Sequence, residues 1–286
     1  MLTPFFHYEF LQNAFISGLL IGLIAPLLGV FIVVRRLSLI ADALSHVSLA
    51  GIAASLYLGS RFTMLAGISP IYFGMLFSVT GSLIIEKLRT VYKHYQELAI
   101  PIIMSGGIGI SVIFISLADG FNTDLFSYLF GSVSAVSRED LLVIIGISAA
   151  VLIVIFSLFK ELFLLSFDEE HAKASGISAK WIHFIFILIV ALVIAASMRI
   201  VGTLLVSALM TLPVAASMRI AKGFKQAIFF SVLFGELSVI LGLILAYQLD
   251  LAPGGTIVLL SILILILCIS YNKIKRGIRR ERTGSA

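Results

Sequence analysis

Runs of about 20 predominantly apolar residues recur from one end of this 286-residue chain to the other. A helix needs about 20 such residues to cross the hydrocarbon core of a bilayer. Hydrophobic residues make up 60% of the chain and charged residues only 12%, which is far from the composition of a soluble domain. The sequence therefore predicts an all-α fold, a polytopic bundle of transmembrane helices.

Nine segments are candidate spans, and we expect eight or nine of them to cross the membrane as parts of one transmembrane domain, residues 1–286. They are residues 11–34, 39–59, 64–86, 99–117, 140–159, 181–201, 203–220, 226–247 and 253–272. The segment 203–220 is the weakest candidate because Pro213 interrupts it. Residues 125–137 are too short to cross, so a re-entrant or surface helix is expected there.

The distribution of positive charge predicts the orientation. If nine spans alternate, 17 of the 20 Lys and Arg residues fall on one side, and only Arg61, Arg138 and Arg199 fall on the other. Lys and Arg concentrate in cytoplasmic loops, so the N-terminus is expected outside and the C-terminus, with its basic tail at residues 273–286, in the cytoplasm. Orientation in a membrane explains the net charge of +5, so a lipid partner is expected and a nucleic-acid partner is not.

Asp42 and His46 lie four residues apart in an otherwise apolar, small-residue segment that runs from Leu37 to Gly51. On a helix this spacing places a carboxylate and an imidazole on one face. Ionisable side chains are costly in lipid, so the pair should face a cavity or a partner helix. The pair is therefore predicted to bind a divalent cation. The single cysteine, Cys268, excludes a Cys-rich zinc site, so nitrogen and oxygen atoms would supply the ligands.

Glu236 is the third candidate metal ligand, because only it and Asp42 among the fifteen carboxylates lie well inside predicted spans. A packing role for a hydrogen-bonded or protonated Glu236 is the alternative. Asp42 lies near the cytoplasmic start of its span, whereas Glu236 lies about 15 Å into its own, at about 1.5 Å per residue. The two would meet only if the second span is displaced or re-entrant.

The longest polar segment between spans, residues 160–180, carries a second candidate site. Ser166 to Glu169 match a capping-box pattern, and Gly176 is a typical helix stop. A short helix is expected there, either as an ordinary solvated loop or as a docking element for a soluble partner. In the second case Phe167 is the apolar anchor, with Asp168, Glu169, Glu170 and Gly176 around it.

The chain lacks the motifs of an enzyme. It contains neither the His-Glu pair of a zinc metalloprotease helix nor a phosphate-binding Gly-x-x-x-x-Gly-Lys loop, and no nucleophile and base are recognisable together. The protein is therefore not expected to hydrolyse ATP by itself.

Several motifs together resemble one family, the zinc/manganese permeases of ABC metal-uptake systems, or ZnuB-type membrane subunits. The resemblance covers nearly the whole chain and is most specific at residues 39–51. Its motifs are Leu39-Ile-Ala-Asp-Ala-Leu-Ser-His-Val-Ser-Leu-Ala-Gly51, Leu129-Phe-Gly-Ser132, Phe167-Asp-Glu-Glu170 with Gly176-Ile177, Val201-Gly-Thr-Leu-Leu-Val206 with Pro213, and Asp250-Leu-Ala-Pro-Gly-Gly-Thr-Ile-Val258.

The resemblance implies a type II importer in a bacterial cell membrane. Two copies of the permease would form a homodimer on two cytoplasmic ATP-binding subunits, and an extracytoplasmic metal-binding protein would deliver the ion. It also gives the predicted loop helix a partner, the ATPase. No permanently bound cofactor is implied, because the metal ion is the cargo. A proton-coupled secondary cation transporter that uses Asp42 and Glu236 as relay groups is the alternative.

Two observations favour zinc over manganese as the cargo. An imidazole with a carboxylate favours zinc by the usual affinity order, although geometry and availability can reverse that order in a cell. Manganese permeases of the family more often read Ser-His-Ala-Val-Leu-Pro-Gly, whereas the sequence from Ser45 to Gly51 resembles the zinc branch. Zinc is therefore the expected cargo, and manganese is the alternative.

Overall fold

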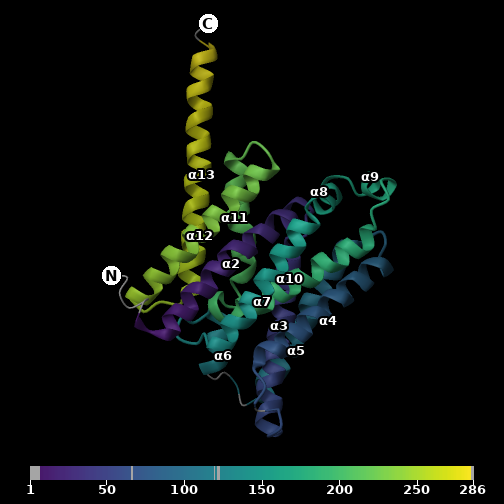
Figure 1. Cartoon of the computed structure of the whole chain (residues 1–286), viewed down its shortest axis with the longest axis vertical. Coiled ribbons are helices and arrows are strands. Elements are labelled where there is room, and N and C mark those ends of the chain that lie inside the picture. The colour runs from purple at the N-terminus through teal and green to yellow at the C-terminus, as the bar shows by residue number, and fades with distance from the viewer. Residues whose placement is uncertain (1–6, 66, 119, 121–122, 285–286) are drawn as a thin grey trace.

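The computed structural model describes residues 7–65, 67–118, 120 and 123–284, with the side chains of residues 123–124 and 276–284 left out. Within these residues the chain forms helices and no strands, which confirms the predicted all-α bundle (Figure 1). The eight long helices are α2 (Glu9–Val34), α3 (Leu39–Arg61), α4 (Pro70–Val91), α5 (Ala99–Leu117), α7 (Arg138–Ser157), α10 (Ala179–Val201), α12 (Phe224–Leu249) and α13 (Pro253–Gly284).

Eight segments in the described part of the chain are long and apolar enough to span a membrane. The ninth predicted span is the shorter helix α11 (Val206–Ile220), whose 15 residues reach about 22 Å, less than the roughly 30 Å of a bilayer core. The predicted span 64–86 begins later than expected, at Pro70. Proline suits the first turn of a helix because it lacks an N–H group and has a fixed φ.

In the described part of the chain, four short helices lie between the long ones. They are η1 (Gln96–Leu98), α6 (Thr123–Phe130), α8 (Phe159–Phe167) and α9 (Glu169–Ala174). A short helix was expected within residues 125–137. Helix α6 is that helix, but it spans Thr123–Phe130 and packs on α10. Helices α8 and α9 lie in the polar segment 160–180, where one short helix was expected.

The centre of the bundle consists of α2, α3 and α10. In their most apolar windows 72%, 78% and 72% of residues are buried, against 22% in both the η1–α5 segment and α13. The peripheral helices therefore keep large apolar faces for lipid or for another protein. The segment with Asp42 and His46 lies on one of the central helices.

Helix α3 is held between α4 and α5 by close contacts at glycines. A Cβ atom added to Gly51 would lie 2.4 Å from the Phe73 carbonyl oxygen, and one added to Gly107 would lie 2.8 Å from a Val47 methyl. Small residues of this kind allow helix backbones to approach in membranes. Gly107 therefore allows a close approach of α5 to α3, whereas no atom lies within 4 Å of a Cβ added at Gly106 or Gly109.

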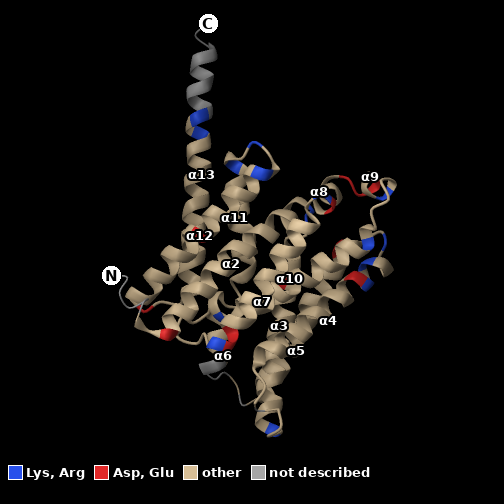
Figure 2. Cartoon of the chain, viewed as in Figure 1, with Lys and Arg blue, Asp and Glu red and all other residues tan. Residues whose placement is uncertain are grey.

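Most of the positive charge lies at one end of the bundle, which we call the basic side. It contains Arg35 after α2, the turn from α4 to α5, the segment 160–180 and the turn from α11 to α12 (Figure 2). The opposite end carries the start of α2, helix α6 and the turn from α12 to α13 (Figure 1).

Candidate functional site

Asp42 and His46 occupy the first two turns of α3, at the basic side of the bundle. The helix begins at Leu39, so the Asp42 carboxylate lies in the first turn, where the positive end of the helix dipole favours it. Both side chains are half-buried, and they interact electrostatically. Neither forms a hydrogen bond or ion pair with another residue in the described ranges, so both keep their ligand atoms available.

The backbone under this pair is fixed from several sides. Ala41, Ala43, Leu44 and Ser45 are buried, and the Ser45 hydroxyl donates to the Ala41 carbonyl oxygen at 2.8 Å. Helix α5 approaches most closely at Gly107, where an added Cβ would lie 2.9 Å from the Val47 nitrogen and 3.1 Å from the His46 carbonyl carbon. A rigid helix in such close contact can hold ligand atoms in a defined geometry.

The structure does not bring Glu236 to this pair. Helix α3 packs on α4, α5, α10 and α11, whereas α12, which carries Glu236, packs on α2, α11 and α13. The Glu236 carboxyl lies 3.4 Å from a Cβ added at Gly22 of α2, in a largely apolar groove of about 440 Å³ between α2, α7 and α12. No group of three His, Cys, Asp or Glu residues able to hold a metal occurs in the described part of the chain.

The predicted loop helix is α9, and its cap differs from the prediction. Ser166 lies inside α8, where its hydroxyl donates to the Leu162 carbonyl oxygen at 2.6 Å. The chain leaves the helical conformation at Asp168, whose carboxylate accepts from the His171 N–H at 2.8 Å and so caps α9. The Ser166 to Glu169 capping box was therefore wrong. The segment before Asp168 is already helical, so the N-cap moves two residues along the chain.

Gly176 ends α9 as the sequence predicted. Its φ is +81°, a left-handed conformation that suits glycine, and its N–H donates to the Lys173 carbonyl oxygen at 3.1 Å. The Ile177 N–H donates to the Ala172 carbonyl oxygen at 3.1 Å, and the two bonds form a Schellman motif. Helix α9 is thus a short element with defined ends, and Glu169 and Glu170 occupy its first turn.

Phe167 joins this loop to the core through other aromatic rings. Its side chain is 60% exposed, yet its ring centroid lies 4.9 Å from that of Phe163 and 5.6 Å from that of Phe224. Phe224 lies 5.3 Å from Phe31 of α2, which in turn lies 6.1 Å from Phe186 of α10. One face of Phe167 is therefore attached to the helix bundle, and the exposed remainder is available to a partner.

One ion pair lies on the surface of α9. Lys173 Nζ lies 2.7 Å from Glu169 Oε1, and both side chains are more than half exposed. The hydrogen bond from Lys173 lowers the pKa of Glu169, and the same contact raises the pKa of Lys173. Solvent screens such an exposed pair, so it contributes little to stability. Glu170 and Asp168 remain exposed on the helix that we expected to dock a partner.

Two polar contacts between distant segments were missed by sequence reasoning. On the basic side, Glu86 Oε1 lies 2.8 Å from His183 Nε2 and 3.1 Å from Arg89 Nη1. At the opposite end, Arg199 donates to the Asp140 carboxylate at 2.5 Å, and Asp140 is only 2% exposed. Opposite charges at the ends of two spans on one side of the membrane were the only signal in the sequence.

These observations define the class of protein as a polytopic helical membrane protein whose central helix α3 carries Asp42 and His46 and whose basic side carries a short loop helix. The sequence matches the ABC 3 transport family over residues 7–272. The chain belongs to this family. The relatives described below are named as membrane or permease proteins of transport systems, not as enzymes.

Relatives of known name cover nearly the whole chain. A "Probable metal transport system membrane protein" of Treponema pallidum is 35% identical over 270 residues, which are 94% of this chain and 98% of the relative. "Manganese import system permease protein ScaB" of Streptococcus gordonii is 36% identical over 274 residues, 96% of this chain and 95% of the relative. The solved structure "PsaBC from Streptococcus pneumoniae in complex with Fab" matches with a TM-score of 0.80 and 32% identity, covering 96% of this chain and 100% of that one.

Proposed function

We propose that this chain is the permease subunit of an ATP-driven importer of a divalent metal ion, and that manganese and zinc are its candidate cargoes. The observation that carries the proposal is the Asp42 and His46 pair on a central, tightly packed helix of an ABC 3 transport family protein. The relatives named for metal or manganese transport support the metal, and family membership removes support from a secondary transporter.

The choice between the two metals rests on opposing arguments. The names of the relatives in Streptococcus gordonii and Listeria monocytogenes favour manganese. The imidazole ligand and the Ser45 to Gly51 motif favour zinc, and relatives at 31% to 36% identity do not confirm that expectation. We propose manganese as the first candidate because the named relatives cover more than nine-tenths of the chain, whereas the motif covers seven residues.

The metal path would use Asp42 and His46 as weak, successive contacts, since an ion that is held too well cannot leave. Two ligands are fewer than the four to six that these metals need. In the proposed homodimer, a second copy of the chain could supply further ligands. Glu236 lies in the α2, α7 and α12 groove, so its part in the path remains a prediction.

The basic side would face the cytoplasm, by the positive-inside rule, and would receive the ATP-binding subunit at α9. An exposed Phe167 followed by three carboxylate side chains fits a docking element that has an apolar anchor and a polar rim. The metal-binding protein would then deliver the ion from the opposite side. The distribution of positive charge supports this orientation, and the exposed surface of α9 supports the docking.

The test measures uptake of radioactive manganese and zinc, each alone, into cells that lack their other importers. Asp42→Asn and His46→Ala should each reduce uptake at least tenfold with the permease still present in the membrane at its normal level. Glu236→Gln serves as the comparison, and we expect a smaller loss. Normal uptake in both the Asp42 and His46 variants would remove the pair from the path, and the metal that accumulates faster in the unmodified protein decides the cargo.

A further inference from the structure

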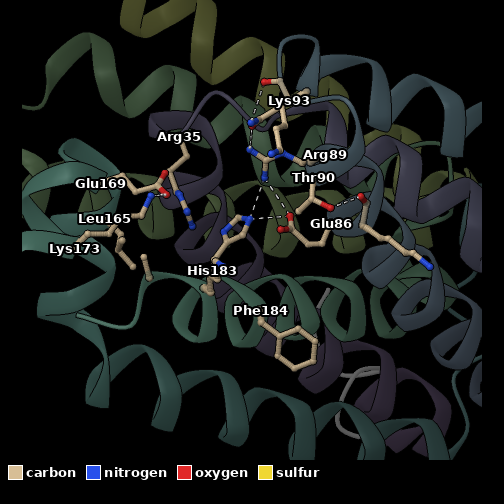
Figure 3. A pocket seen from close by; sticks show the side chains of 14 residues that line it. Arg35, Glu86, Arg89, Thr90, Lys93, Leu165, Glu169, Lys173, His183 and Phe184 are labelled. Carbon is tan, nitrogen blue, oxygen red and sulfur yellow. Dashed lines mark hydrogen bonds and ion pairs between the residues drawn. The ribbon is translucent and has the colours of Figure 1, made fainter. Parts of the chain in front are cut away.

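A pocket of about 760 Å³ opens on the basic side, next to the loop helix (Figure 3). It lies between the end of α2, the end of α4 with its turn into α5, the α8–α9 segment and the start of α10. Its lining is rich in cations, namely Arg35, Lys87, Arg89, Lys93, Lys173 and Lys180, against the two carboxylates of Glu86 and Glu169. The pocket is therefore positively charged before any partner enters it.

Both carboxylates of the pocket already form ion pairs within the chain. Glu86 Oε1 lies between Arg89 and His183, at 3.1 Å and 2.8 Å, and Glu169 Oε1 lies 2.7 Å from Lys173 (Figure 3). The remaining four cations, Arg35, Lys87, Lys93 and Lys180, form no ion pair within the described ranges. Of these four, Arg35 is influenced by the charges of Glu169 and Glu86 without forming an ion pair with either.

Arg35 is the most informative of the four because it is partly buried. Its Nη1 atom is fully buried and has no hydrogen-bond partner among the described residues. The guanidinium carbon lies 5.6 Å from the centroid of the Phe186 ring, which supports one face of the group. Desolvation lowers the pKa of Arg35, with the Glu169 charge acting in the opposite direction. Buried polar groups in native proteins are almost always hydrogen-bonded, so a buried Arg35 nitrogen without a partner in a cationic pocket points to a missing anion.

One margin of this pocket is apolar and aromatic. Phe184 lines it and is 38% exposed, and the neighbouring Trp181, the only Trp of the chain, is 68% exposed. The two rings meet edge to face, with centroids 5.9 Å apart. Trp side chains favour the interface between membrane and water, and α10 enters its membrane-spanning segment at this point. A ligand in the pocket would thus have its charge among cations and its apolar part beside these rings.

We propose that this pocket binds a phosphate-bearing anion, and that its source is the headgroup of an anionic phospholipid in the leaflet on the basic side. Arg35, Lys93 and Lys180 would contact the phosphate, and Phe184 and Trp181 would contact the acyl chains. Basic pockets between transmembrane helices are suited to such headgroups. The apolar margin favours a lipid over free phosphate and over an acidic segment of a protein partner.

Occupancy of this pocket would link the loop helix to the bundle. Helix α9 contributes Glu169 and Lys173 to the lining, and α4 and α10 contribute the other walls. An anion held among these elements would restrain the position of α9 relative to the spans. The lipid would therefore stiffen the loop helix, whether the cargo is manganese or zinc.

The experiment uses the purified complex of the permease with its ATPase, stripped of lipid in detergent. Thermal unfolding is followed during titration with phosphatidylglycerol, with phosphatidylcholine and with inorganic phosphate. We expect phosphatidylglycerol alone to raise the unfolding temperature. Lys93→Gln and Lys180→Gln should each raise the phosphatidylglycerol concentration at half-saturation about fivefold. Lys222→Gln, an equal change of charge on the same side but outside the pocket, should leave the half-saturation unchanged.

Each of the other possible outcomes contradicts the proposal for a different reason. If inorganic phosphate produces the stabilisation, with the same dependence on Lys93 and Lys180, and prevents the response to lipid, the site takes a soluble phosphate and the lipid source is overturned. If phosphatidylcholine acts equally, or if Lys222→Gln weakens the response as much as the pocket variants do, the pocket is not an anion site. A complex that responds to neither phospholipid nor phosphate indicates that a carboxylate of the ATPase fills the pocket, which also overturns the proposal.

Discussion

Replacing Gly107 with alanine tests whether the contact between α5 and α3 holds Asp42 and His46, the proposed metal ligands, in place. The new methyl group would lie 2.8 Å from a Val47 methyl, 2.9 Å from the Val47 nitrogen and 3.1 Å from the His46 carbonyl carbon. Carbon atoms in contact prefer a separation of about 3.5–4.0 Å. The backbone atoms of α3 cannot rotate away, so α5 must move by several tenths of an ångström or more.

The expected change in the free energy of unfolding follows from two opposing effects. Alanine in place of glycine inside a helix stabilises by about 0.5–1 kcal/mol, whereas overpacking a close contact costs about 1–3 kcal/mol. Gly106→Ala is the matched control, because it lies in the same helix and has no atom within 4 Å of the added Cβ. In Gly106→Ala, only the stabilising effect of alanine over glycine applies. The two variants should therefore differ in unfolding free energy by about 1–3 kcal/mol, with Gly107→Ala the less stable.

Two assays measure the consequence. Thermal unfolding of the two purified variants should place Gly107→Ala several degrees below Gly106→Ala, at about 2–4 °C for each kcal/mol. Metal uptake at equal expression should fall in Gly107→Ala only, because the turn with His46 is displaced. Equal unfolding temperatures and equal uptake in the two variants would refute the claim that this contact positions the pair.

Three further results are expected. Phe167→Asp should release the ATPase while leaving the permease in the membrane, and a complex that stays assembled with normal ATP hydrolysis would show that α9 is not the joint. Arg199→Met should destabilise the protein by about 3–5 kcal/mol in thermal unfolding, because Asp140 keeps a buried charge without its cation, and adding Asp140→Asn should recover much of the loss. A cysteine at Ser175 in a Cys268→Ser background should be protected from an impermeant thiol reagent in intact cells, and labelling from outside would reverse the proposed orientation.

Local patterns in the sequence predicted the parts of this structure that depend on neighbouring residues. The length of the apolar runs located the spans to within a few residues, except where Pro70 delays the start of α4. The spacing of Asp42 and His46 placed them on one helix, and Gly176 marked the end of α9. Each of these features depends on the conformation of about one helical turn, which propensity and spacing describe well.

Features that depend on which helices are neighbours could not be predicted in the same way. Glu236 was grouped with the cation-ligand pair because all three are ionisable groups in apolar surroundings, yet α12 packs on α2 rather than on α3. The contact between Glu86 and His183 spans 97 residues of sequence. Uniformly apolar spans resemble one another, so their sequences contain little information on which faces meet.

The arrangement of these parts gives the loop helix a short physical route to Asp42 and His46, the proposed metal ligands. The ring of Phe167 contacts Phe224, which contacts the fully buried Phe31 near the end of α2. Only the turn at residues 35–38 separates α2 from α3, whose first turn carries Asp42. Packed interiors have few voids and low compressibility, so they transmit a displacement instead of absorbing it. With α5 fixed against the His46 turn at Gly107, a displacement of the end of α2 would tilt the start of α3 about that contact. In the proposed importer, such a tilt would move the two ligands relative to the path when the ATPase moves α9.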